Sequence, residues 1–137
     1  MSKLRVIVLA LLCVCVAPVY VAADAFDGSQ PLVCATIKAI ECSVEGECFH
    51  GTAESVNIPQ FFKIDFNQKM ISEIKQGGDK RSSKITHMDH LNGKVVLQGM
   101  GEHLAWSVAI SGGTGKIVIT ASGDQVGFVV FGACTPL

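Results

Sequence analysis

Apolar and polar residues alternate along most of the chain after residue 30, with a period of two rather than the helical period of 3.6. In "LAWSVAI", for example, the large apolar residues Leu104, Trp106, Val108 and Ile110 share one face. "FFKIDF", "KIVITAS" and "GFVVFGAC" follow the same rule and are rich in the β-branched and aromatic residues that favour strands. Nine segments fit, the second with the weakest alternation: 32–42, 50–57, 60–67, 69–75, 83–91, 94–99, 103–111, 115–122 and 126–134.

Turn-forming residues separate these segments. Asn92-Gly93 is the strongest signal, because both residues tolerate the positive φ angles of a two-residue hairpin. Short links between successive strands predict an all-β antiparallel meander of about eight strands. A meander must close or cover its apolar face, so we predict a small lipocalin-like β-barrel. An open sandwich and a single curved sheet are the alternatives.

The first 23 residues have the features of a secretory signal peptide. Lys3 and Arg5 precede the apolar run "VIVLALLCVCVAPVYVAA", which ends in small residues. We expect cleavage after Ala23 or Ala25, which leaves a single domain over residues 24–137. The alternative is an uncleaved segment, which would be the protein's only contact with a membrane and is short for a bilayer span.

Four cysteines remain after removal of this segment, and an oxidising compartment would convert them into two disulfides. Cys42 and Cys48 flank the polar turn "SVEGE", so a hairpin would bring them within bonding distance. That pairing leaves Cys34 with Cys134, which would hold the first and last strands side by side. The alternative of a structural zinc site is disfavoured, because the spacing C-x7-C-x5-C-x-H matches no common zinc pattern.

Several aromatic residues lie on the inward face of the predicted strands. They either fill the core or line a cavity for a small apolar ligand, and the candidate lining residues are Trp106, Phe62, Phe66 and Phe128. A second apolar face is formed by Val118, Val129 and Phe131, which would point outward. We therefore expect part of the outer wall to be covered by the Cys42–Cys48 segment, by the N-terminal region or by another chain.

Catalytic and metal-binding motifs are weak. His87 and Asp89 share a strand face and could bind a metal with His103 from a neighbouring strand, while His50 lies beside the predicted 42–48 disulfide. No serine-hydrolase elbow accompanies the histidines and acids. We predict no cofactor and no catalytic residue, with a metal-dependent or hydrolytic enzyme using His87, Asp89, His103 or His50 as the alternative.

The charge balance excludes one class of partner. Loss of Lys3 and Arg5 lowers the basic residues from 11 to 9 against 12 acids, and the net charge moves from −1 to −3. An acidic surface disfavours nucleic acid, since phosphate binding needs clustered Lys and Arg. The one basic cluster, Lys80, Arg81 and Lys84, falls in a predicted solvated loop.

With "GTAESVNIPQFFKIDF" and the ending "SGDQVGFVVFGACTPL", the chain resembles a group of small exported bacterial proteins of unknown function that end in FG-x-C-TP. The resemblance implies a bacterial periplasmic or secreted setting and brings no activity or binding residues. We therefore predict an exported, non-enzymatic β-domain that binds a small apolar ligand or an envelope protein. A structural or stress-related envelope protein is a further alternative.

Overall fold

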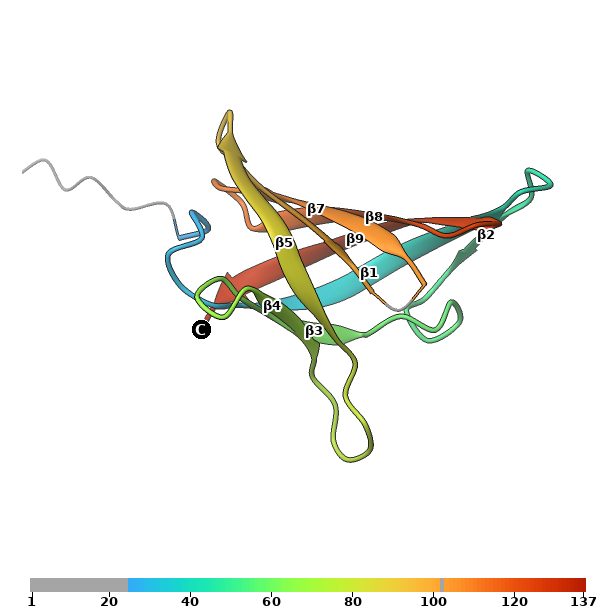
Figure 1. Cartoon of the computed structure of the whole chain (residues 1–137), viewed down its shortest axis with the longest axis horizontal. Coiled ribbons are helices and arrows are strands. Elements are labelled where there is room, and N and C mark those ends of the chain that lie inside the picture. The colour runs from blue at the N-terminus through green and yellow to red at the C-terminus, as the bar shows by residue number, and fades with distance from the viewer. Residues whose placement is uncertain (1–24, 102) are drawn as a thin grey trace, which may run out of the picture.

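The computed structural model describes residues 25–101 and 103–137, which form nine strands in one sheet (Figure 1). The predicted signal peptide, residues 1–23, lies outside the described residues. Within them, no helix is long and apolar enough to cross a membrane. The strands are β1 (Leu32–Ser43), β2 (Cys48–Gly51), β3 (Phe61–Asp65), β4 (Met70–Glu73), β5 (Ser82–Leu91), β6 (Lys94–Met100), β7 (Ala105–Ser111), β8 (Lys116–Ser122) and β9 (Val126–Pro136).

These strands close into the predicted barrel. Each pairs antiparallel with its neighbour in the order β1-β3-β4-β5-β6-β7-β8-β9, and β9 returns to pair with β1, which gives eight strands in the ring. The seam between β1 and β9 runs from Leu32↔Pro136 to Ser43↔Val126 (Figure 1). Closure leaves the ring itself without a free edge. The ninth strand, β2, is attached outside the ring to the second half of β1.

The prediction of a strand at residues 50–57 is wrong in its extent. The strand is Cys48–Gly51, and residues 53–57 form a turn closed by the hydrogen bonds from Asn57 N to Glu54 O and from Ile58 N to Ala53 O. The turn forms because Ala53 and Val56 are buried under the inner face of the sheet. A straight strand would have pointed these two side chains to opposite faces.

A β-bulge at Ile37 explains how β1 serves two neighbours. Residues 32–35 of β1 pair with β3, whereas residues 39–42 pair with β2. The register shifts between Thr36 and Lys38, which bends the strand and leaves Ile37 69% exposed. Segment 52–60 follows the bulge and is fastened there, because Thr36 N donates to Gln60 O at 2.9 Å and Thr36 Oγ1 donates to Pro59 O at 2.8 Å.

Inward side chains fill the ring. Because apolar and polar residues alternate along each strand, every second side chain points inward. The largest of the fully buried side chains are Leu32, Cys34, Ile64, Val95, Leu97, Val108, Ile110 and Ile117. They belong to one cluster with Phe62, Phe66 and Ile85. A second, smaller cluster of Ala39, Val56 and Val130 lies where segment 52–60 covers the other end of the β1–β9 seam.

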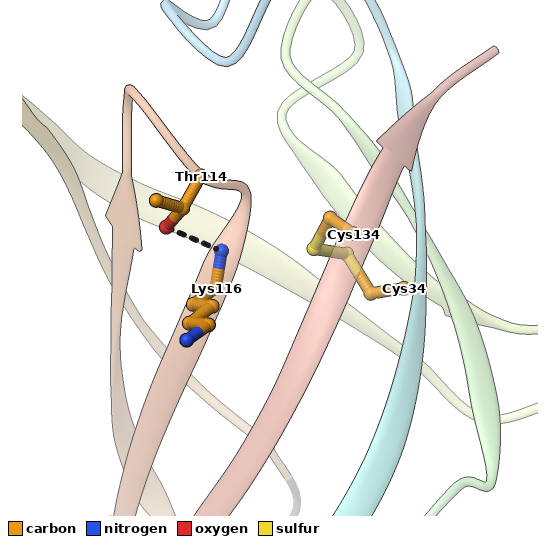
Figure 2. The surroundings of a disulfide bond; sticks show 4 residues. All are labelled: Cys34, Thr114, Lys116 and Cys134. Atoms are coloured by element: carbon orange, nitrogen blue, oxygen red, sulfur yellow. Dashed lines mark hydrogen bonds between the residues drawn. A yellow bond between two sulfur atoms is a disulfide. The ribbon is translucent and has the colours of Figure 1, made fainter.

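Both predicted disulfides are present. Cys34–Cys134 joins β1 to β9 across a sequence separation of 100 residues, and Cys42–Cys48 joins β1 to β2 across six (Figure 2 shows the first). Each bridge links directly opposed residues, with Cα–Cα distances of 4.0 and 4.1 Å. The first bridge therefore holds the barrel closed, and the second holds β2 against the ring.

We predict unequal stability losses when the two bridges are removed. In the loop-entropy description, a loop of about 100 residues contributes about 4–5 kcal/mol and a loop of six about 2 kcal/mol. Replacing Cys34 and Cys134 together by alanine should therefore lower the free energy of unfolding, measured in urea, by about twice as much as replacing Cys42 and Cys48. Equal losses would contradict the assignment of barrel closure to the long bridge.

Candidate functional site

The aromatic residues predicted to line a ligand cavity lie in or against the packed interior. Phe62 is 4% exposed and Phe66 is 6% exposed, and both belong to the main cluster. Trp106 packs partly buried against that cluster, and Phe128 packs against the smaller one. An eight-stranded barrel is either filled by side chains or holds one small ligand, and these residues fill it.

The position of Trp106 is explained by packing and hydrogen bonding within the barrel wall. Its ring lies over Gly99, its partner on β6, where any Cβ would collide with the indole. The indole N–H donates to Ser83 Oγ at 2.8 Å, and Ser83 Oγ donates to Met100 O at 2.9 Å. Both polar groups are thus satisfied, as buried tryptophan requires.

The metal candidates do not form a site in the described residues. His87 and Asp89 lie on the outer face of β5, opposite Gln98 and Val96, while His103 is exposed in the β6–β7 loop and His50 is exposed on β2. Residues 25–101 and 103–137 contain no group of three His, Cys, Asp or Glu side chains that could hold a metal ion. His87 and Asp89 share the outer face of β5, and the described residues supply no third ligand there.

The predicted second apolar face is the most distinctive feature of the outer wall. Cross-strand pairing aligns Phe131 with Val118, Val118 with Ala109, and Ala109 with Val96. We call the outward residues Val96, Ala109, Val118, Val129 and Phe131 the outer apolar strip. It crosses β6–β9 and ends at charged residues, because Phe131 also pairs with Lys38 and Val96 with Asp89.

The strip is accessible. Phe131 is 41% exposed and Val118 is 39% exposed, although they are opposed on neighbouring strands. One neighbouring row of the outer wall is polar on β5–β8, where it contains His87, Gln98, Ser107 and Thr120, and it ends on β9 at Val129 of the strip. A continuous apolar row between polar and charged neighbours is typical of a surface that binds another molecule.

Two of the segments expected to cover this face lie elsewhere. The Cys42–Cys48 hairpin extends the sheet at its far end and does not fold back over the strip (Figure 1). The chain from residue 25 crosses one barrel end, where Phe26 packs against the main cluster and next to Gly115. None of the described segments therefore covers Phe131 and Val118 of the strip.

The same barrel end carries a pocket of about 190 Å³ between the N-terminal segment and the hairpins at Asn92 and Gly112. Phe26, Val95 and Leu91 supply apolar walls, and Asp27, His90 and Lys94 supply charge. Hydrogen bonding to the Ser29 side chain and then to its backbone N–H, which lies 2.8 Å from Asp27 Oδ1, lowers the pKa of Asp27, aided by the nearby His90. The pocket is small for a ligand site, since these usually span about 300–1,000 Å³.

The predicted solvated basic loop contains one anchored residue. Arg81 donates through Nε and Nη2 to both oxygens of Glu73, at 3.1 and 3.2 Å, and through Nη1 to Asn57 O at 2.6 Å. Arg81 thereby ties the β4–β5 loop to segment 52–60. The hydrogen bonds and charge of Arg81 hold the pKa of Glu73 below its ordinary value of 4.5.

The Arg81–Glu73 ion pair makes the free energy of unfolding depend on pH in a defined direction. A carboxyl group with a lowered pKa stabilises the fold above its unfolded pKa, and that stabilisation is lost as the pH falls through the folded value. Replacing Arg81, whose side chain is 49% exposed, by glutamine should cost about 1 kcal/mol at pH 7. The difference from wild type should shrink below pH 4.5 in urea titrations.

Lys80→Gln is the matched control, since Lys80 is an exposed neighbour with no ion pair in the described residues. It should unfold like wild type at both pH values. A loss for Arg81→Gln that stays constant from pH 7 to about pH 3 would assign the effect to the Asn57 contact instead.

No protein-family model, curated protein or solved structure matches this chain. The resemblance to small exported bacterial proteins stays a prediction.

Proposed function

We propose that this protein is an exported, non-enzymatic binding domain that holds an envelope or extracellular protein on the outside of its barrel. The observation that carries the proposal is the outer apolar strip, in which Phe131 and Val118 remain about 40% exposed on a rigid, disulfide-closed wall. Burying a side chain such as Phe131 against a partner would contribute about 2 kcal/mol. The polar and charged rows beside it would form the rim of the interface.

The packed interior favours a protein partner over a small apolar ligand. The four aromatic residues predicted to line a cavity are used in packing, and the pocket at the barrel end is charged and small. The scattered positions of His50, His87 and His103 give the enzymatic alternative no converging groups. The strip, in contrast, is a row of aligned apolar side chains on the outer wall.

The export part of the proposal has its own test. Disulfides persist in oxidising compartments, which supports a periplasmic or secreted location. We predict that N-terminal sequencing of the protein purified from its native host will find Asp24 or Phe26 as the first residue. A protein that retains Met1, recovered from the cytoplasm with free thiols, would contradict export.

The partner surface is tested by removing the aromatic side chain of the strip, Phe131. Phe131→Thr keeps β-propensity and should leave the melting temperature nearly unchanged, because the side chain is 41% exposed. We predict that it weakens association with the partner by about tenfold or more, measured by quantitative cross-linking in intact cells followed by affinity measurement with the purified partner.

Met100→Thr is the control for this experiment. Met100 is 70% exposed at the end of β6 and lies outside the strip, so the substitution removes apolar surface of similar kind. It should leave cross-linking unchanged. Equal cross-linking by wild type, Phe131→Thr and Met100→Thr would refute the strip as the partner surface.

A further inference from the structure

Strand β2 has a free edge. It pairs with β1 on one side and stands at the end of the strand order, so no strand of the described chain lies on its other side. Its residues Cys48, Phe49 and His50 are exposed. A free strand edge presents unpaired N–H and C=O groups that can bind an extended peptide as an additional strand.

The hairpin geometry identifies which groups face outward. Ser43 N donates to Glu47 O at 2.8 Å, so Ser43 and Glu47 form a hydrogen-bonded pair. Such pairs alternate with non-hydrogen-bonded ones along an antiparallel ladder. Cys42↔Cys48 and Ile40↔His50 are therefore non-hydrogen-bonded pairs, and the N–H and C=O groups of Cys48 and His50 point away from β1.

The Cα–Cα distance of 4.1 Å between Cys42 and Cys48 agrees with this assignment, because non-hydrogen-bonded pairs are the closer kind. None of the backbone or side-chain hydrogen bonds of the described residues uses the outward groups of Cys48 and His50. The disulfide keeps the four-residue strand extended, so a peptide would meet a preformed edge.

The surroundings of this edge are acidic. Residues 39–62 contain no Lys or Arg, and the acids around β2 are Glu41, Glu45, Glu47, Glu54 and Asp124, against Lys38, which directly precedes the part of β1 that pairs with β2. Asp124 belongs to this group because Val44 N donates to Gln125 O at 3.0 Å, which holds the β8–β9 turn beside the tip of the hairpin. Arg81 reaches the same region at Asn57, but Glu73 neutralises its charge.

The two faces of the edge differ in chemistry. Register places Glu41 and Phe49 together on one face, and the Cys42–Cys48 disulfide, Ile40 and His50 on the other. Phe49 is 56% exposed. An added strand would therefore direct alternate side chains toward a carboxylate with an aromatic ring, and the others toward a mainly apolar surface.

We propose that the free edge of β2 binds an extended segment of another protein in which Lys or Arg alternates with apolar residues. The segment hydrogen-bonds to Cys48 and His50, and its basic side chains are selected by the acidic residues around the strand. This site adjoins the outer apolar strip at Val129, which pairs with Ile40, whereas Phe131 pairs with Lys38 in a different row. A second copy of the chain is the less favourable occupant, because pairing of two β2 edges would bring two acidic clusters together.

The test uses the mature protein and capped, fluorescently labelled peptides. We predict that Lys-Val-Lys-Val-Lys-Val binds in an anisotropy titration and that Glu-Val-Glu-Val-Glu-Val binds at least about tenfold more weakly. Two variants of the Lys-Val peptide carry an N-methyl group on every second backbone amide, one variant on the odd-numbered amides and the other on the even-numbered amides. Each variant keeps the charge of the parent peptide but cannot donate hydrogen bonds along one of its two edges. One of the two variants should bind about tenfold more weakly.

Two substitutions at one position locate the binding. His50→Pro removes the outward N–H without removing a β1–β2 hydrogen bond, and proline is tolerated on such an edge. It should weaken peptide binding about tenfold, whereas His50→Thr, which keeps the N–H, should bind like wild type. Retention of the Cys42–Cys48 disulfide, checked by peptide mass, shows that the hairpin is intact in both variants.

The proposal is overturned if the Lys-Val peptide fails to bind at millimolar concentration, or if His50→Pro and both methylated peptides bind like their parents. The second result would mean attraction of charge without strand addition. A His50→Pro-sensitive dimer in sedimentation, without peptide binding, would assign the edge to a second copy and also overturn it. Phe131→Thr should bind the peptide normally, so failure here and failure of the proposed function are distinguishable.

Discussion

Pairing of the first strand with the last is the constraint on which the rest of the structure depends. β1 and β9 are separated by most of the chain, yet they pair from Leu32↔Pro136 to Ser43↔Val126 and are joined by Cys34–Cys134 (Figures 1 and 2). Without this seam the meander would be an open sheet with two long edges. With it, the inward residues of all eight strands share one interior and can be buried together.

The β-bulge at Ile37 allows the β1–β9 pairing to continue beyond the part of β1 that pairs with β3. Beyond it, β1 leaves β3 and continues alongside β9, with β2 on its other flank. Segment 52–60 then fills the gap that β3 leaves, fastened at Thr36 and by Arg81. A single extra residue in β1 therefore produces both the covered barrel end and the free edge of β2, which a regular strand would not provide.

Much of this fold could be predicted from the sequence, because two signals were strong. Period-two alternation identified eight strands, as in "LAWSVAI", and four cysteines with one short spacing limited the disulfide pairings. The bulge at Ile37 was not predictable, since it depends on how β1 is shared between β2 and β3. Residues 50–57 were misassigned for a related reason: Ala53 and Val56 are apolar because segment 52–60 turns beneath the sheet.

The candidate sites were less accessible to sequence reasoning than the strands. Alternation correctly placed Val118, Val129 and Phe131 outside, but it could not decide whether Phe62 and Phe66 fill the barrel or line a cavity. That outcome depends on how side chains from opposite walls meet across the interior. The free edge of β2 left no sequence signal, because an edge is defined by the absence of a neighbour in space.

The acidic residues around β2 oppose self-association through its edge, which is left free although the barrel is closed. Any free edge presents unpaired N–H and C=O groups and can pair with an identical edge. Glu41, Glu45 and Glu47 oppose it, because two like-charged edges repel each other when they meet. The same charges would attract a strand of opposite sign, so the proposed selection of a basic partner and the protection against self-association have one physical origin.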